Sequence, residues 1–247
     1  MIMTGFTPLN TEHCVLSDSR IDLWQFSLEH EVADANQLLN EDEKARARRF
    51  YFPKHARRFS TARVMMKIIL SRYLNIRPAR LEFSYNNYGK PAVINSQKLH
   101  FNLSHTGDLA LLAVGKGITM GVDIEHYSAR PYEGIAKNLF SDAELSEFLH
   151  LPASLKPAVF FHIWAQKEAF IKACGMGLSY PTKQFSVPTR IPTRQLIIDP
   201  MHNNTWQLHS FMPQIACSGA LCYHPSVREV RYGVMQVKQS VDLNFDY

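Results

Sequence analysis

Hydrophobic residues recur along the chain at two spacings, and the shorter spacing predicts strands. In residues 118–125, apolar side chains at the even positions alternate with small or polar side chains at the odd positions. Side chains two residues apart on a strand lie on the same face, so this pattern predicts a strand with one apolar and one polar face. A continuous apolar run in residues 109–114 predicts a buried strand before it, followed by a turn at residues 115–117.

The longer spacing predicts helices. In residues 59–73, apolar side chains recur three and four residues apart, while Arg58, Arg63 and Lys67 lie off that face. This spacing predicts an amphipathic helix that packs on a sheet and leaves its basic residues outside. Pro53 separates it from an earlier helix that runs toward residue 50.

Two capping-box patterns mark other helix starts. Asn40 precedes Glu43 by three residues, and Ser141 precedes Glu144 in the same way. A long helix is predicted for residues 157–174, because glycines follow it directly and the left-handed conformation that ends many helices favours glycine.

Short apolar segments between these helices predict the remaining strands, at residues 21–28, 81–84, 184–187, 206–211, 216–223 and 230–237. Each half of the chain thus combines helices with short strands. We therefore expect an α+β fold of two similar lobes, residues 1–115 and residues 116–247.

Composition places the chain among globular proteins. It has 247 residues, of which 46% are hydrophobic and 20% charged. No apolar run is long enough to span a bilayer, and residues 1–10 lack the pattern of a secretion signal, so we expect a cytoplasmic protein that does not associate with membranes. The four cysteines form no CxxC pair, which predicts reduced, packed thiols.

The net charge of +5 is concentrated in one segment. Residues 44–72 contain no acid and ten cations: Lys44, Arg46, Arg48, Arg49, Lys54, Arg57, Arg58, Arg63, Lys67 and Arg72. Such a segment suits phosphate groups, an acidic protein or nucleic acid, although a solvated helix surface is the simpler interpretation.

Three acids are candidates for a metal site. Asp123 and Glu125 share the polar face of the predicted strand, where their like charges repel unless a cation or a proton offsets them. Glu168 interrupts the apolar stripe of the long helix and needs a partner, which Lys172 could supply one turn later. Carboxylates of this kind suit Mg²⁺, whereas solvated acids and a simple salt bridge are the structural alternatives.

Residues 101–107 predict a polar loop between two apolar strands, and its Ser104 and His105 could hold a phosphate group. Adjacent serine and histidine residues do not make a hydrolase site, and the chain has no GxSxG elbow, P-loop or GxGxxG motif.

Taken together, these motifs resemble the 4′-phosphopantetheinyl transferases of the surfactin-synthetase-activating type. The resemblance runs in order from about residue 40 to residue 187, through the segments Arg48-Arg49-Phe50-Tyr51, Gly89-Lys90-Pro91, Phe101-Asn102-Leu103-Ser104-His105, Gly121-Val122-Asp123-Ile124-Glu125, residues 164–172, and Gly175-Met176-Gly177-Leu178. The chain departs from the family pattern at Val122 and at Ala165-Gln166, and the part beyond Val187 matches only loosely.

The resemblance implies a pseudo-twofold pair of α+β lobes with coenzyme A in the cleft between them. It implies that Asp123, Glu125 and Glu168 bind Mg²⁺, and that Glu168 is also the base for the serine proton. Lys172 would contact coenzyme A phosphates and assist catalysis. The remaining coenzyme-binding residues implied are Arg46, Arg49, Lys90, Pro91, Ser104 and His105.

The implied reaction transfers phosphopantetheine from coenzyme A to a serine of an apo acyl or peptidyl carrier protein and releases 3′,5′-ADP. Because the chain has the length of both lobes, we expect a monomer. A nucleic-acid-binding protein that uses the basic segment is the main alternative, and a metal-dependent phosphodiesterase acting on coenzyme A is another. The sequence leaves the carrier protein and its pathway open.

Overall fold

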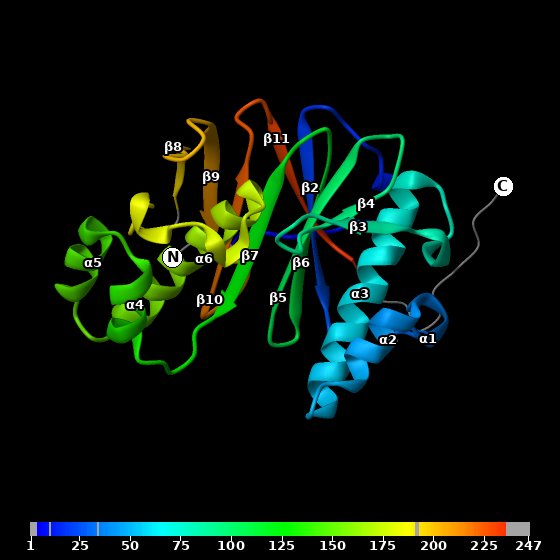
Figure 1. Ribbon diagram of the computed structural model, residues 1–247, viewed down its shortest axis with the longest axis horizontal. Helices are drawn as coiled ribbons and strands as arrows, with labels where there is room; N and C mark the ends of the chain where they lie inside the picture. Colours follow the sequence, from blue (N-terminus) through cyan, green and yellow to red (C-terminus); the bar gives the residue numbers. More distant parts are fainter. Residues whose placement is uncertain (1–3, 10, 34, 191–192, 236–247) are drawn as a thin grey trace. The chain divides into compact units, whose positions relative to one another are not determined.

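The computed structural model describes residues 4–9, 11–33, 35–190 and 193–235 (Figure 1). The chain divides into two compact units, each described below by itself. Unit 1 contains the described residues of 1–5, 85–90 and 118–228, and unit 2 contains those of 6–84, 91–117 and 229–247. The chain therefore crosses between the units more often than a division into residues 1–115 and 116–247 would require.

Unit 2 is built on a five-stranded sheet in the order β1-β11-β2-β6-β5. Its strands are β1 (Thr7–Pro8), β2 (Arg20–Ser27), β5 (Leu99–Thr106), β6 (Leu109–Lys116) and β11 (Glu229–Val234). β11 pairs with β1 and β2 in parallel, whereas β2, β6 and β5 pair antiparallel. The predicted strands at residues 21–28 and 109–114 are thereby confirmed, and the end of the last one, at residues 236–237, lies outside the described residues.

Three helices and a small hairpin complete unit 2, except that Tyr85, at the end of the first hairpin strand, belongs to unit 1. They are α1 (Ala35–Leu38), α2 (Glu41–Arg48), α3 (Pro53–Leu74), β3 (Phe83–Tyr85) and β4 (Pro91–Val93), with 3-10 turns at Thr11–His13 and Pro78–Arg80. α3 begins with Pro53 at its first position, and Asn75 ends it in the left-handed conformation with φ 52°. Its predicted apolar face is buried, which confirms the amphipathic helix.

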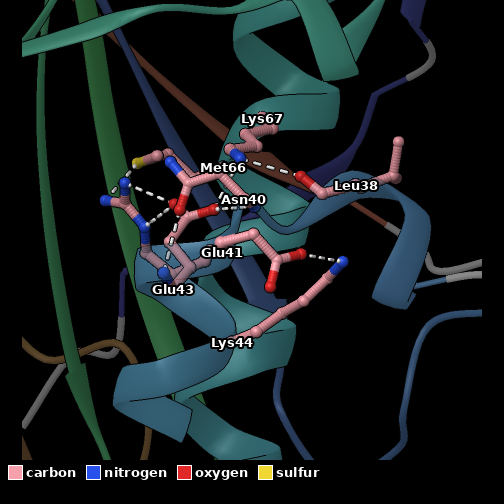
Figure 2. Close-up of polar contacts among 8 residues, drawn as sticks. Leu38, Asn40, Glu41, Glu43, Lys44, Met66 and Lys67 are labelled. Carbon is pink, nitrogen blue, oxygen red and sulfur yellow. Dashed lines mark hydrogen bonds and ion pairs between the residues drawn. The ribbon is translucent and has the colours of Figure 1, made fainter.

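One basic residue of α3 lies inside the unit. Lys67 was expected outside, yet it is buried, and its ammonium lies 2.6 Å from Glu43 and 2.8 Å from the Leu38 carbonyl (Figure 2). Glu43 also accepts a hydrogen bond of 2.7 Å from Arg63 and completes the capping box with Asn40. The expectation was wrong because an acid just before the basic segment compensates the charge of Lys67.

Unit 1 packs a long helix on a four-stranded antiparallel sheet in the order β7-β10-β9-β8. Its elements are β7 (Met120–His126), α4 (Tyr132–Leu139), α5 (Asp142–Leu149), α6 (Lys156–Cys174), β8 (Arg194–Ile198), β9 (Thr205–Phe211) and β10 (Cys217–Tyr223), with 3-10 turns at Gly177–Ser179 and Thr182–Gln184. The capping box of Ser141 and Glu144 is present, and Gly175 ends α6 with φ 76°. The mixed α+β fold is therefore confirmed.

Residues 184–187 do not form the predicted strand. Gln184 ends a 3-10 turn, and the apolar Phe185 and Val187 after it are buried in the core of unit 1 without pairing in its sheet. The edge strand β8 was not predicted. Four of its five residues are exposed, and its sequence RQLII does not alternate between apolar and polar residues.

Two further expectations have a structural outcome. All four cysteines are free thiols, and three of them are buried, as predicted. Among the described residues, no helix combines the length and the apolar character needed to cross a membrane.

Candidate functional site

Asp123 and Glu125 lie on β7 and meet side chains from α6. Asp123 is only 4% exposed, and its Oδ1 lies 2.7 Å from the Nζ of Lys172. Glu125 is half-buried, and its Oε1 accepts a hydrogen bond of 3.0 Å from the Nε1 of Trp164. The spacing alone predicted neither pair, since each joins residues that are far apart in the sequence.

The close approach of α6 to β7 depends on Gly121. A Cβ atom at this position would overlap the carbonyl oxygen of Ala169 and the amide nitrogen of Ala173. Glycine therefore lets the helix backbone approach the strand. This approach brings the α6 residues Glu168 and Lys172 to the strand that carries Asp123.

Negative charge is costly in this part of unit 1. Burial raises the pKa of Glu125 to about 7, and the charge of Asp123 adds to the increase. Burial and the charge of Asp123 also raise the pKa of Glu168, while the charge of Lys172 opposes the increase. A further cation would relieve the repulsion among these acids.

The chemistry of these side chains fits magnesium, because Mg²⁺ prefers carboxylate oxygens and keeps open positions for water and phosphate. With the side chains as they stand, no three His, Cys, Asp or Glu residues in the described ranges form a group that could hold a metal ion. The assignment of Asp123, Glu125 and Glu168 as ligands therefore stays a prediction.

The loop that contains Lys90 is tied to the end of α6. The Nζ of Lys90 donates to the carbonyls of Met120 at 3.0 Å and Lys172 at 2.5 Å, and burial lowers the pKa of Lys90 to about 8. Asn86 donates to the Gly175 carbonyl at 2.7 Å and accepts from the Lys90 amide. Asn86 and Lys90 thus bind backbone carbonyls at the C-terminal end of the helix.

The other predicted residues belong to unit 2. Ser104 and His105 lie within β5 rather than in a loop; Ser104 is buried and His105 is exposed. A cavity of about 420 Å³ is lined by Arg46, Phe50, His55, Arg58, Phe59, His105, Thr106 and Gly107. It brings together Arg46 and His105 of the predicted set, whereas Ser104, Arg49 and Pro91 are not among its lining residues. Pro91 begins β4.

Asp108 holds Arg58, one of the side chains that line this cavity, in place. It accepts hydrogen bonds from Arg58 at 2.8 and 2.7 Å and from Arg57 at 3.0 Å. The hydrogen bonds from Arg58 and Arg57, together with the charges of these arginines, lower the pKa of Asp108 to about 2. Sequence reasoning missed Asp108 and Arg58 as site residues, although the acid follows the His105-Thr106-Gly107 segment directly.

Comparison with known proteins gives the same family across both units. The sequence model of the "4'-phosphopantetheinyl transferase superfamily" matches residues 119–218, and that of "4'-phosphopantetheinyl transferase, N-terminal" matches residues 22–116.

Three curated proteins illustrate the similarity. The chain is 37% identical to 4'-phosphopantetheinyl transferase HetI of Nostoc sp., over 72% of this chain and 78% of that protein. It is 34% identical to 4'-phosphopantetheinyl transferase Sfp of Bacillus subtilis, over 61% and 66% of the two chains. It is 31% identical to 4'-phosphopantetheinyl transferase ffp of Bacillus subtilis, over 75% and 82%. Both family models match, one in each unit, and the site combines acids and a lysine from a strand and a helix. The chain therefore belongs to the 4'-phosphopantetheinyl transferase superfamily and is a transferase of the Sfp and HetI type.

Proposed function

We propose that this transferase takes phosphopantetheine from coenzyme A and attaches it to a serine of an apo acyl or peptidyl carrier protein, releasing 3′,5′-ADP. The proposal depends most on one observation, the convergence of Asp123 and Lys172 beside Glu125 and Glu168 in a chain of this family. Transfer from a pyrophosphate needs both a metal ion and a direct cationic contact. The acids can bind the metal ion, and the lysine can supply the contact.

In this proposal, Asp123, Glu125 and Glu168 hold Mg²⁺. The bound ion would offset the charge of the coenzyme A pyrophosphate and favour departure of the leaving oxygen. Lys172 is poised for a contact with phosphate, because its ammonium lies beside Asp123 and its side chain is 28% exposed. Glu168 would accept the proton of the carrier serine.

The basic cavity of unit 2 supports the proposed contact with the 3′-phosphate of coenzyme A. Arg46, Arg58 and His105 line it, and these side chains can donate hydrogen bonds to a phosphate group. We propose that Arg49 and Ser104 add to this contact. Since the ammonium of Lys90 is bonded to backbone carbonyls, we propose that the Lys90-Pro91 segment contacts the adenine through other atoms.

A mass measurement tests the proposal. Purified protein is incubated with coenzyme A, Mg²⁺ and a panel of apo-carriers, and a gain equal to one phosphopantetheine is expected on at least one carrier. Omission of the metal with a chelator, and a carrier whose serine is replaced by alanine, are the controls. If no apo-carrier in a broad panel gains mass, the proposal is wrong; phosphopantetheine released without a carrier would instead support the phosphodiesterase.

No observation favours the nucleic-acid alternative. In unit 2, five of the ten cations in residues 44–72 form ion pairs with Glu41, Glu43 or Asp108. These pairs interrupt the continuous cationic surface that a nucleic-acid backbone needs. The monomeric state and the cytoplasmic location stay predictions, and sedimentation of the purified protein would check the first.

A further inference from the structure

The chain turns from α2 into α3 at the bottom of Figure 1, and the aromatic and basic side chains of this turn are exposed. We name this group the basic aromatic corner and define it by Arg48, Tyr51, Phe52 and Lys54. Tyr51 is 90% exposed and Phe52 is 53% exposed. Two neighbouring aromatic side chains with so much apolar surface in water are unusual unless another molecule covers them.

The corner is held in a defined conformation by its own contacts. The rings of Tyr51 and Phe52 meet edge to face at 4.9 Å between centroids, and Lys54 lies 5.8 Å from the centre of the Phe52 ring. Pro53 occupies the first turn of α3 and fixes the backbone there. A partner that binds here would lose little free energy in ordering these side chains.

The cations of residues 44–72 differ in whether an acid pairs with them. Five form ion pairs with acids: Lys44, Arg57, Arg58, Arg63 and Lys67. Arg46, Arg48, Arg49 and Lys54 are exposed and form no ion pair with any residue in the described part of the chain, and Arg46 and Arg49 belong to the proposed phosphate contact. The two that remain, Arg48 and Lys54, stand on either side of Tyr51 and Phe52 in the sequence.

We propose that the basic aromatic corner is a docking surface for the apo-carrier protein, an acidic partner that presents an apolar side chain between carboxylates. The proposal rests on the proposed function. Tyrosine and arginine contribute strongly to protein interfaces, and uncompensated cations at a rim draw an acidic partner in and orient it. Two cations at one corner make too short a track for a nucleic-acid backbone, so a protein partner fits better.

Two double variants test the corner: Tyr51→Ser with Phe52→Ser, and Arg48→Glu with Lys54→Glu. Their matched controls are Ile94→Ser and Arg80→Glu, which change side chains that are also exposed and belong to the same unit. Arg80 follows the other end of α3, and 22 residues of helix span about 33 Å, so the control charge lies far from the corner. Thermal unfolding is measured for all four proteins to confirm that each one folds.

We expect each corner variant to raise the KM for the apo-carrier about tenfold and to leave the KM for coenzyme A unchanged, since one lost hot-spot contact typically costs this factor or more. Calorimetry with a carrier whose serine is replaced by alanine should show the same loss of affinity without any reaction. Added salt should weaken carrier binding by the wild type and have less effect on the charge-reversed variant.

Unchanged carrier KM and affinity in both corner variants, with active wild-type protein, would overturn the docking surface and leave the proposed function intact. Absence of transfer by the wild type to every carrier would instead overturn the proposed function. Salt-sensitive binding of a single-stranded oligonucleotide that is lost in the corner variants, while carrier affinity is kept, would assign the corner to nucleic acid and contradict the proposal.

Discussion

Lys172 and Glu168 lie one turn apart on α6, beside the acids of strand β7. The charge state of each residue therefore depends on that of its neighbours. The ammonium of Lys172 is 2.7 Å from Asp123, and its charge opposes the rise in the pKa of Glu168. A single substitution here changes the electrostatics of the whole group, and conservative replacements that keep the shape are the informative ones.

Glu168→Gln keeps the size of the side chain and removes its charge. We expect this variant to fold as the wild type does, because Glu168 has a raised pKa in the folded protein and gains little from ionisation there. Transfer to the apo-carrier should fall at least about a hundredfold if the carboxylate is the base and a metal ligand. The mass assay gives the rate and thermal unfolding gives the stability; undiminished transfer would contradict both roles.

His162 should make unit 1 sensitive to acid. It is 1% exposed on α6, and burial lowers its pKa from 6.5 to about 4. An unfolded chain takes up the proton near pH 6.5, so this contribution to stability is complete above pH 6.5. It is lost as the pH falls toward 4, by up to roughly 3 kcal/mol.

Chemical denaturation between pH 7 and pH 4 would measure this effect. The slope of stability against pH should be smaller in His162→Gln than in the wild type. Equal slopes in wild type and His162→Gln would show that other groups cause the acid sensitivity.

At the scale of the element, the packing of α6 on β7 depends on a missing side chain. In Gly121→Ala, the new Cβ would meet the Ala169 carbonyl and the Ala173 amide, which belong to rigid helix backbone. We expect a loss of at least about 3 kcal/mol in the free energy of unfolding, because helix and strand must separate. Gly134→Ala on α4 is the matched control: nothing lies within 4 Å of its new Cβ, and alanine favours a helix by roughly 1 kcal/mol. Equal stability of the two variants would contradict the close packing.

The sequence predicted those elements whose signals are local. The two capping boxes, the proline at the start of α3 and the glycine at the end of α6 each act within a few residues of where they stand. Lys67 could not be placed, because its burial depends on Glu43, 24 residues away. Phe185 and Val187 gave a strand pattern, but burial in the core also satisfies apolar residues that pair with nothing.

The candidate site could be predicted only in part, because some of its contacts join residues that are far apart in the sequence. Resemblance to the family singled out Asp123 and Lys172, and the structure brings these two together. Trp164 and Asn86, which position Glu125 and the end of α6, are recognisable only when contacts over 39 and 89 residues are known. Contacts of that length are set by tertiary packing, which no local spacing records.

At the scale of the whole molecule, β11 joins the last described part of the chain to the first. It pairs in parallel with both β1 and β2, and it lies beyond the part of the chain that either family model matches. Ending the chain at residue 228 would leave unit 2 without a strand from inside its sheet and would expose one edge of β2. We expect unit 2 of the truncated protein to unfold or aggregate.

Hydrogen exchange would check this outcome unit by unit. Amides of β2 and β6 should lose protection in the truncated protein, while amides of β9 and β10, which pair within unit 1, should keep more of theirs. A chain that ends at residue 235 keeps β11 and serves as the control. Full protection of β2 after the truncation would show that β11 adds nothing to unit 2.

The place of β11 also fixes an order of events during synthesis. Every residue of unit 1 has been translated once the ribosome passes residue 228, whereas unit 2 still lacks residues 229–234 at that moment. The usual order, in which the amino-terminal part of a nascent chain matures first, is therefore reversed here. Most of unit 2 is made early, yet its sheet must wait, with β2 half paired, until residues 229–234 have been translated.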